Sequence, residues 1–165
     1  MPIDQTVFRT AMSRLGAAVN VVTTDGPAGR YGIVVSAVCS VTDSPPTVLV
    51  CVSRSSGANA VLKENGVLAI NILAGRHRDL SIAIAKAAAH ERFASGDWTT
   101  METGAPVLDD AAVALDCHVS SVSEVGSHSV FFAEVDAIKV HDEVDGLVWF
   151  DRDYQRLQST ASTRV

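Results

Sequence analysis

The sequence predicts a mainly β fold with short helices, in which the strands form a closed or nearly closed barrel. Runs rich in β-branched residues recur along the chain, separated by clusters of Gly, Pro, Asp and Ser, which is the pattern of short strands joined by turns. Only a few short segments show helical spacing of their apolar residues. About six or seven strands with this spacing are typical of a small barrel.

The composition indicates one globular domain over residues 1–165. Apolar residues make up 47% of the chain and charged residues 19%, so the chain can form a single core. The formal net charge of −6 disfavours nucleic acid or an anionic membrane as a partner. No run reaches the roughly 18 apolar residues of a membrane span, and MPIDQTVFRT lacks the features of a signal peptide. We therefore expect a cytoplasmic protein.

The first half of the chain begins with an amphipathic helix over residues 4–15, which Asp4 can cap. Its apolar residues recur at helical spacing at Phe8, Ala11, Met12 and Leu15. A strand over residues 17–24 follows and ends at the turn DGPAG. The next expected elements are strands at 31–42 and 47–53, joined by DSPP, a short helix at 55–66 that stops at Gly66, and a buried strand at 67–73.

The second half starts with a mostly helical segment at 78–93, followed by a loop-like region from Trp98 to Asp110. It ends in three further strands, expected at 111–125, 127–141 and 146–151. The first two are consistent with an antiparallel pair around a Val-Gly-Ser-His turn.

The chain lacks the common catalytic and metal-binding motifs. It has no G-x-G-x-x-G, no Walker A sequence, no H-E-x-x-H and no G-x-S-x-G, and its histidines show no metal-ligand spacing. The three cysteines, Cys39, Cys51 and Cys117, have no C-x-x-C spacing and are expected to be buried, reduced thiols. No metal site is expected.

The run S-R-S-S at 53–56 leaves a strand and opens a helix. The free N–H groups of a helix N-terminus, together with three hydroxyls and Arg54, suit a phosphate. The alternative is an ordinary hydroxyl-capped helix with a solvated arginine.

The strand around residues 32–40 carries small polar residues where a core strand usually has bulky ones. Small side chains leave room for a flat heterocycle against the backbone, and its phosphate would then lie at 53–56. Close packing against another strand or subunit explains the same residues, and composition does not decide between the two.

Several motifs, in order along the chain, resemble the short-chain flavin reductases, the small reductase components of two-component flavin monooxygenases. The motifs are GIVVSAVCSVTDSPPTVLVCVSRSS, ENGVLAINIL, ERF with Trp98 just beyond, GSH and LVWFDRDY. The resemblance runs from about Phe8 to Leu157. Members similar to it include the reductases of 4-hydroxyphenylacetate 3-monooxygenase and of pyrimidine degradation.

This resemblance implies a flavin-binding split β-barrel that works as a homodimer. The implied reaction is hydride transfer from NADH, or possibly NADPH, to FMN or FAD, after which the reduced flavin diffuses to a separate monooxygenase. Hydride transfer between two cofactors needs no strong acid or base, which accounts for the missing catalytic motifs.

The resemblance also implies the site residues. Those matched to the flavin are Val35, Ser36, Ala37 and Val38 at the ring, Cys51, Val52, Ser53, Arg54, Ser55 and Ser56 along the ribityl chain and phosphate, and Arg92 and Phe93 of ERF. His128 in the turn with Gly126 matches the family's histidine beside the nicotinamide, and Tyr154 matches an aromatic position near the same pocket.

Two residues depart from the family pattern. The family often has Thr at the position of Val34, and Asp or Thr at the position of Ser127. These departures leave the flavin and nicotinamide preferences open. Two other function classes also remain, namely a split-barrel flavoprotein that keeps FMN bound as an electron carrier or oxidase, and a non-catalytic flavin- or haem-binding barrel.

Overall fold

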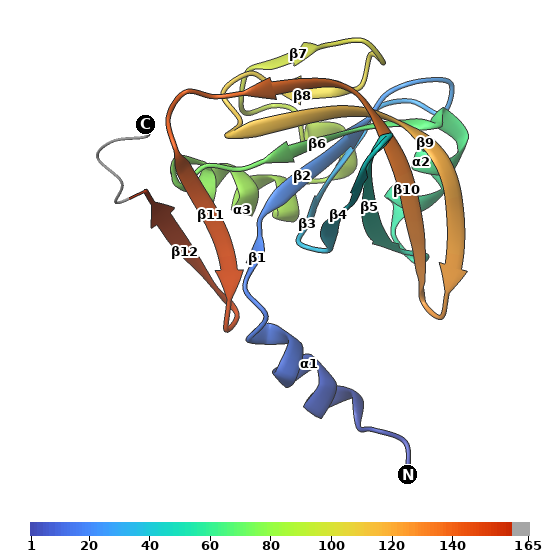
Figure 1. Ribbon diagram of the computed structural model, residues 1–165, viewed down its shortest axis with the longest axis vertical. Helices are drawn as coiled ribbons and strands as arrows, with labels where there is room; N and C mark the ends of the chain where they lie inside the picture. Colours follow the sequence, from blue (N-terminus) through green and yellow to red (C-terminus); the bar gives the residue numbers. More distant parts are fainter. Residues whose placement is uncertain (160–165) are drawn as a thin grey trace.

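Antiparallel strands dominate the computed structural model, which describes residues 1–159 (Figure 1). The strands of the main sheet are Asn20–Thr24 (β2), Tyr31–Val35 (β3), Val38–Asp43 (β4), Pro46–Ser53 (β5), Val67–Ile72 (β6), Val113–Val125 (β9) and His128–Val140 (β10). Their spatial order is β3-β2-β6-β9-β10-β5-β4. The two edge strands, β3 and β4, are consecutive in the chain and are joined only by Ser36 and Ala37. The barrel is therefore split between β3 and β4 and does not close.

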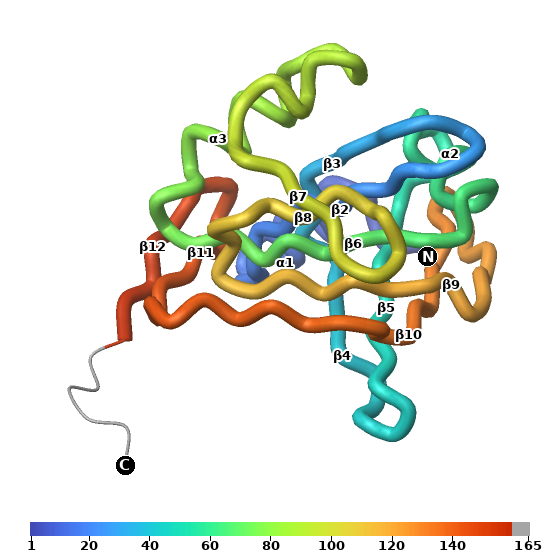
Figure 2. The backbone as a smooth tube through the Cα atoms, turned by 90° about the horizontal axis from the view of Figure 1, so that it is seen from above, coloured from blue at the N-terminus to red at the C-terminus, as the bar shows by residue number. Residues whose placement is uncertain are grey.

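Two smaller sheets flank the main one. The first has the order β1-β11-β12 and the second pairs β7 with β8, with bounds Ala17–Ala18 (β1), Trp98–Thr100 (β7), Pro106–Leu108 (β8), Asp145–Phe150 (β11) and Asp153–Gln158 (β12). Figure 2 shows β9 and β10 side by side along the main sheet, with β11 and β12 beyond one of its ends. Two register shifts along the β9–β10 pair bend this long hairpin.

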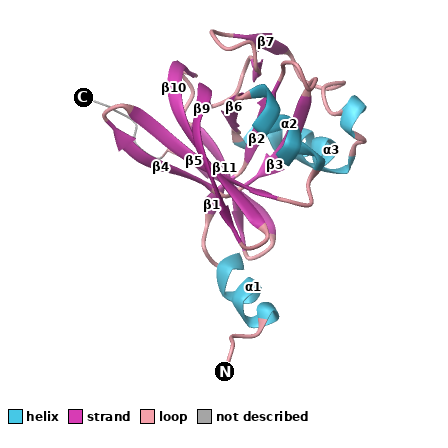
Figure 3. Cartoon of the chain, turned by 90° about the vertical axis from the view of Figure 1, so that its right-hand side faces the viewer, coloured by secondary structure: helices cyan, strands magenta, loops and turns pink. Residues whose placement is uncertain are grey.

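Short helices cover one side of the split. Helix α2 (Gly57–Asn65) and helix α3 (Arg78–Lys86) both pack against β3 and lie together on that side of the sheet (Figure 3). Two 3₁₀ turns, Gly75–His77 and Ala89–Glu91, flank α3. Helix α1 (Gln5–Ser13) instead projects away from the sheets (Figures 1 and 3). Among the described residues, no helix has the length and apolar character needed to cross a membrane.

The core forms two main clusters of buried apolar residues. The inward-facing residues of β5, Val48, Val50 and Val52, alternate with half-buried ones, as expected for a strand with one buried face. They pack with Phe131 of β10 and Leu62 of α2. A second cluster joins α3 to β11 through its buried apolar residues, which include Leu73, Ile84, Leu108 and Leu147.

Most of the expected elements are confirmed. Asp4 caps α1 by accepting hydrogen bonds from the amides of Thr6 and Val7 at 2.8 and 3.2 Å, and Gly66 ends α2 with a positive φ of 67°. The single strand expected at 31–42 is wrong, because the chain leaves the ladder at Ser36 and Ala37 and resumes as β4.

The region from Trp98 to Asp110 was expected as a loop, but it contains the short pair β7 and β8. Strand β12 was not expected at all. It follows a two-residue turn at Asp151 and Arg152, both with positive φ, which is the backbone of a type I′ turn without its usual Asn-Gly sequence.

Candidate active site

A slot of about 430 Å³ opens at the split between β3 and β4. Its walls come from the end of β3 and the link to β4, from the end of β5, from α3, and from the turn between β9 and β10. The lining residues are Ile33, Val34, Val35, Ser36, Ala37, Cys51, Val52, Ser53, Ser56, Ala85, Arg92 and His128. The slot therefore brings together segments that are distant in the sequence.

The link between β3 and β4 gives the slot one wall of small residues. The carbonyl of Ser36 accepts a hydrogen bond from the amide of Val38 at 2.9 Å, and the carbonyl of Ala37 accepts one from the amide of Cys51 at 3.0 Å. These bonds fix the link against β4 and β5. With Ala85 of α3 and the serines of the 53–56 loop, the wall leaves room that larger side chains would fill.

The S-R-S-S loop lies at the N-terminal end of α2, as the sequence predicts. Ser56 caps the helix by accepting a hydrogen bond from the amide of Ala58 at 3.3 Å. The hydroxyls of Ser53 and Ser55 lie 2.9 Å apart, and the amide of Ser55 donates to the hydroxyl of Ser53 at 3.3 Å. The loop thus presents hydroxyl groups beside a helix N-terminus, and Ser53 and Ser56 line the slot.

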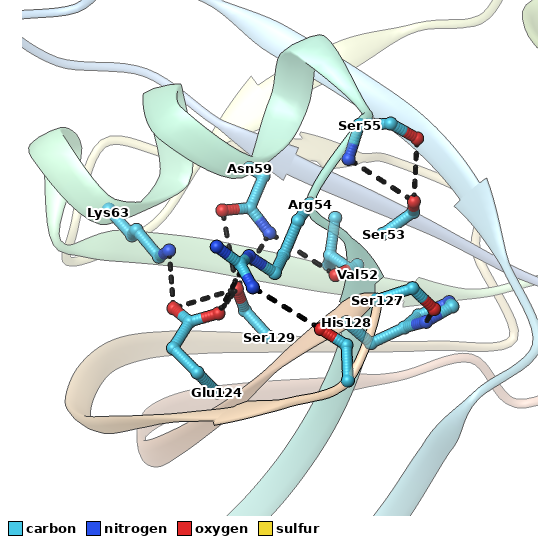
Figure 4. A network of polar contacts seen from close by, with 11 residues as sticks. Val52, Ser53, Arg54, Ser55, Asn59, Lys63, Glu124, Ser127, His128 and Ser129 are labelled. Atoms are coloured by element: carbon cyan, nitrogen blue, oxygen red, sulfur yellow. Dashed lines mark hydrogen bonds and ion pairs between the residues drawn. The ribbon is translucent and has the colours of Figure 1, made fainter.

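Arg54, within the same loop, is not among the residues that line the slot. Its Nε lies 3.4 Å from Oε2 of Glu124, and its Nη1 donates to the carbonyl of Gly126 at 3.3 Å (Figure 4). Its backbone amide donates to the carbonyl of Ser127 at 2.9 Å. Arg54 therefore connects the S-R-S-S loop to the β9–β10 turn.

The β9–β10 turn brings His128 to the slot. Gly126 has a positive φ of 55°, which allows the tight reversal, and His128 pairs in register with Ser53 of β5. The hydroxyl of Ser127 lies 2.9 Å from Nδ1 of His128, so the serine at this departure from the family pattern still contacts the imidazole. A side-chain oxygen at position 127 orients the ring.

Arg92 and Phe93 lie in different surroundings, although the family resemblance implies that both face the flavin. Arg92 lines the slot, donates to the carbonyl of Gly32 at 2.7 Å, and lies over the ring of Tyr31 at 5.2 Å. Phe93 instead packs edge to face against Trp98 with ring centroids 5.0 Å apart, and its ring lies so close to Gly32 that a Cβ there would approach it to 3.1 Å. Phe93 is thus not among the residues lining the slot.

A second cavity of about 250 Å³ adjoins the slot and contains Tyr154. It shares Val34, Val35, Ser36 and Ala85 with the slot, and its far side is formed by Val19, Trp149 and Tyr154. Val34, the other departure from the family pattern, therefore contributes an apolar surface to both cavities.

The remaining expected site residues lie close to the slot without lining it. Val38 begins β4 and packs against the core, while Ser55 and Gly126 belong to the loop and the turn that flank the slot. Sequence reasoning missed Ile33 and Ala85, which line the slot. An alanine inside a helical segment carries no signal for such a role.

The cysteines give no sign of nucleophilic chemistry. Burial raises the pKa of the Cys51 thiol, and burial followed by the charge of Asp116 raises the pKa of Cys117 to about 12, so both remain neutral thiols. Cys117 is buried as expected, but Cys51 is only half-buried and Cys39 is exposed on β4, so the expectation that all three are buried was wrong. No group of three potential metal ligands occurs within residues 1–159.

Comparison with known families decides the assignment. The profile of the flavin reductase like domain matches residues 12–158. The chain belongs to this family. The sequence-based resemblance and the expected mainly β split barrel are thereby confirmed.

Individual relatives agree with the assignment. An FMN reductase (NADH) RutF of Stutzerimonas stutzeri is 48% identical over 160 residues, covering 96% of this chain and 92% of the relative, and RutF 2 of Rhizobium rhizogenes is 50% identical over 151 residues, covering 91% and 87%. A solved flavin reductase structure from Haemophilus somnus superposes with a TM-score of 0.90 at 37% identity, covering 94% of this chain and all of the other. The NADH:FAD oxidoreductase SgcE6 of Streptomyces globisporus has a TM-score of 0.89 at 25% identity, covering 96% of each chain. These relatives confirm the expectation of a flavin reductase that uses NADH.

Proposed function

We propose that this chain, as a single flavin reductase-like domain, reduces FMN with NADH and releases the reduced flavin to a separate monooxygenase. The observation that carries the proposal is the slot at the split between β3 and β4, walled by small residues and bordered by hydroxyl groups, Arg92 and His128. The similarity to FMN reductases (NADH) of Stutzerimonas stutzeri and Rhizobium rhizogenes supports FMN and NADH over FAD and NADPH.

The residues around the slot fit a flavin nucleotide. Ser36 and Ala37 leave space for a flat ring, and the hydroxyls of Ser53 and Ser56 lie at the positive end of α2, where a phosphate is favoured. Arg92 adds a cation at the slot. The bound flavin and nicotinamide supply the redox chemistry, since dihydronicotinamide gives up a hydride that oxidised flavin accepts.

The protein's contribution is to hold and orient these molecules. The pinned β3–β4 link provides a fixed surface for the ring, because its carbonyls are already bonded to β4 and β5. His128, whose ring is held by the Ser127 hydroxyl, orients the nicotinamide. Tyr154 and Trp149 form a recess beside the slot, which offers an apolar surface to the nicotinamide.

A homodimer is the second part of the proposal. No residue of α1 is buried, and its apolar side chains Val7, Phe8 and Met12 are 63%, 57% and 45% exposed. A helix of nine residues is too short to be stable alone in water, so the apolar face of α1 needs a partner surface. Phe8 of α1 and His128 of the β9–β10 turn line the same cavity of about 500 Å³. A second copy that covers α1 would therefore also lie next to this turn.

The test of the activity is the oxidation of NADH by the purified protein with added FMN under anaerobic conditions. We expect reduction of free FMN over many turnovers, with lower efficiency for FAD and for NADPH. A protein that stays yellow after dialysis and reduces only its bound flavin would instead be an electron carrier or oxidase. Absence of any flavin reduction would overturn the proposal.

The test of the dimer is a mass measurement in solution by light scattering. The wild type should have twice the mass of the chain, and the double variant F8E/M12E should be monomeric and still folded. A monomeric wild type would contradict the dimer while leaving the reductase activity open to its own test.

A further inference from the structure

We infer that Glu124 is a specificity-determining residue, whose carboxylate holds Arg54 and competes for it with the phosphate of a flavin nucleotide bound in the slot. The inference rests on the proposed function, because it places the phosphate at the S-R-S-S loop. It concerns a residue of the β9–β10 hairpin that none of the sequence motifs includes.

Glu124 is anchored from the protein interior by a directed chain of hydrogen bonds. Asn59 of α2 is 5% exposed and Ser129 of β10 is fully buried. The Nδ2 of Asn59 donates to the carbonyl of Val52 at 3.2 Å and to the hydroxyl of Ser129 at 3.0 Å. The single proton of that hydroxyl is then free to go to Glu124, whose Oε2 lies 2.9 Å away (Figure 4). The carboxylate is therefore fixed in place.

The cations that meet this carboxylate are on the surface. Lys63 of α2 donates to Oε1 at 2.6 Å, whereas Nε of Arg54 is 3.4 Å from Oε2. The side chains of Arg54 and Lys63 are 58% and 38% exposed. The hydrogen bond from Lys63, followed by that from Ser129, lowers the pKa of Glu124, so the carboxylate is charged at neutral pH.

Arg54 is the member of this network that can move. Its contacts to Glu124 and to the carbonyl of Gly126 are both long, and exposed ion pairs are weak. Its neighbours Ser53 and Ser56 line the slot, so a change of side-chain rotamer would turn the guanidinium toward a phosphate there. A phosphate dianion attracts a guanidinium more strongly than a carboxylate does, and the two anions compete for it.

The consequence is a limit on how well the site distinguishes phosphorylated from unphosphorylated flavin. Part of the attraction between Arg54 and the phosphate is offset, because Arg54 must give up its ion pair with Glu124. A protein that releases its product benefits from this arrangement, because the same cation bound without competition would slow dissociation.

The experiment compares dissociation constants for FMN and for riboflavin, which has the same ring without the phosphate, measured by quenching of flavin fluorescence. The E124Q variant keeps a side-chain oxygen that can accept from Ser129 but removes the charge. We expect its preference for FMN over riboflavin to rise roughly three- to fivefold, with riboflavin affinity unchanged. The matched control E102Q makes the same charge change at an exposed residue outside the network and should behave as the wild type.

The role of Arg54 is isolated by the variants R54A and R54A/E124Q. If the carboxylate acts through Arg54, the gain from E124Q should disappear in the double variant, whose preference should equal that of R54A. The gain should also shrink at high salt, which a purely structural effect of the substitution would not do.

Three outcomes separate the possibilities. An unchanged FMN preference in E124Q, or a gain that persists in R54A/E124Q, overturns the inference even if the wild type reduces FMN. A wild type that binds neither flavin overturns the proposed function itself. Thermal melting of each variant checks that the hairpin remains folded.

Discussion

Two networks of polar side chains, each centred on a buried asparagine, serve different purposes in this molecule. Asn71 of β6 donates to the carbonyl of Val21 at 3.0 Å and accepts from the amide of Leu108 at 2.7 Å, so it ties β2, β6 and β8 together inside the protein. Asn59 begins in the same way, with bonds to Val52 and Ser129, but its network ends at exposed charges beside the slot. A network closed in the interior stabilises the fold, whereas one that reaches the surface can also act on a ligand.

The largest expected effect is the loss of the interior network. Asn71→Ala leaves the buried Leu108 amide without the side-chain oxygen that it donates to, and it removes an additional bond to the Val21 carbonyl. We expect the free energy of unfolding to fall by about 2–4 kcal/mol, because unsatisfied buried polar groups are costly. Urea denaturation measures the loss, and flavin affinity per folded molecule should stay as in the wild type. A variant as stable as the wild type would contradict the role given to Asn71.

The corresponding substitution in the network of Asn59 should cost less stability than Asn71→Ala but should change ligand binding. Asn59→Ala removes the bonds to the Val52 carbonyl and to the Ser129 hydroxyl, so nothing from Asn59 then directs the hydroxyl proton toward Glu124. We expect a smaller loss of about 1–2 kcal/mol in unfolding free energy, together with a changed preference between FMN and riboflavin. Denaturation and flavin titration on the same samples check both. If Asn71→Ala changed the ligand preference and Asn59→Ala did not, the distinction between the networks would fail.

His128 lines the slot beside the network of Asn59, and we expect it to affect the reaction with NADH but not the binding of flavin. For His128→Ala we expect FMN affinity within about twofold of the wild type and a fall of about tenfold in kcat/KM for NADH. His90→Ala removes an exposed histidine elsewhere and serves as the control. Collapse of flavin binding with unaltered NADH kinetics would contradict the role proposed for His128.

The smallest effect is a dependence on pH that only the second network can show. The pKa of Glu124 is lowered from its ordinary value of 4.5, chiefly by the hydrogen bond from Lys63 and then by that from Ser129. A lowered pKa in the folded state contributes stability that is present above pH 4.5 and is lost as the pH falls through the folded value. Below pH 4.5 the wild type should therefore lose more stability than E124Q, with E102Q following the wild type. The measurement is the free energy of unfolding in urea at a series of pH values. Identical pH dependence in the wild type and E124Q would show that the Glu124 carboxylate does not link stability to pH.

The sequence predicted much of the fold because local patterns determine many of its elements. The apolar spacing and cap of α1, the Ser56 and Gly66 ends of α2 and the alternation in β5 all carry their information within a few residues. Strand β12 follows a turn at Asp151 and Arg152 whose positive φ values have no sequence signal, so it could not be foreseen.

The site was predicted less completely because side-chain direction depends on tertiary neighbours. Several residues that the family resemblance assigns to flavin or nicotinamide line the slot, since the segments that carry them meet at the split. They include Ser53, Ser56, Arg92 and His128. Arg54 and Phe93 stand in the same motifs, yet Arg54 faces Glu124, which is distant in the sequence, and Phe93 packs on Trp98 with its ring against the likewise distant Gly32. Ala85 enters the slot only because α3 packs on β3.

The most direct test of the account is to fill the slot. Ala37 lies in the link between β3 and β4 and is exposed, so Ala37→Trp puts a large ring into the slot without disturbing the core. Titration with FMN, followed by fluorescence, should show binding to the wild type and a loss of more than about tenfold in affinity for the variant, with an unchanged melting temperature. A folded variant that binds FMN as tightly as the wild type would contradict the claim that the flavin lies at the split between β3 and β4.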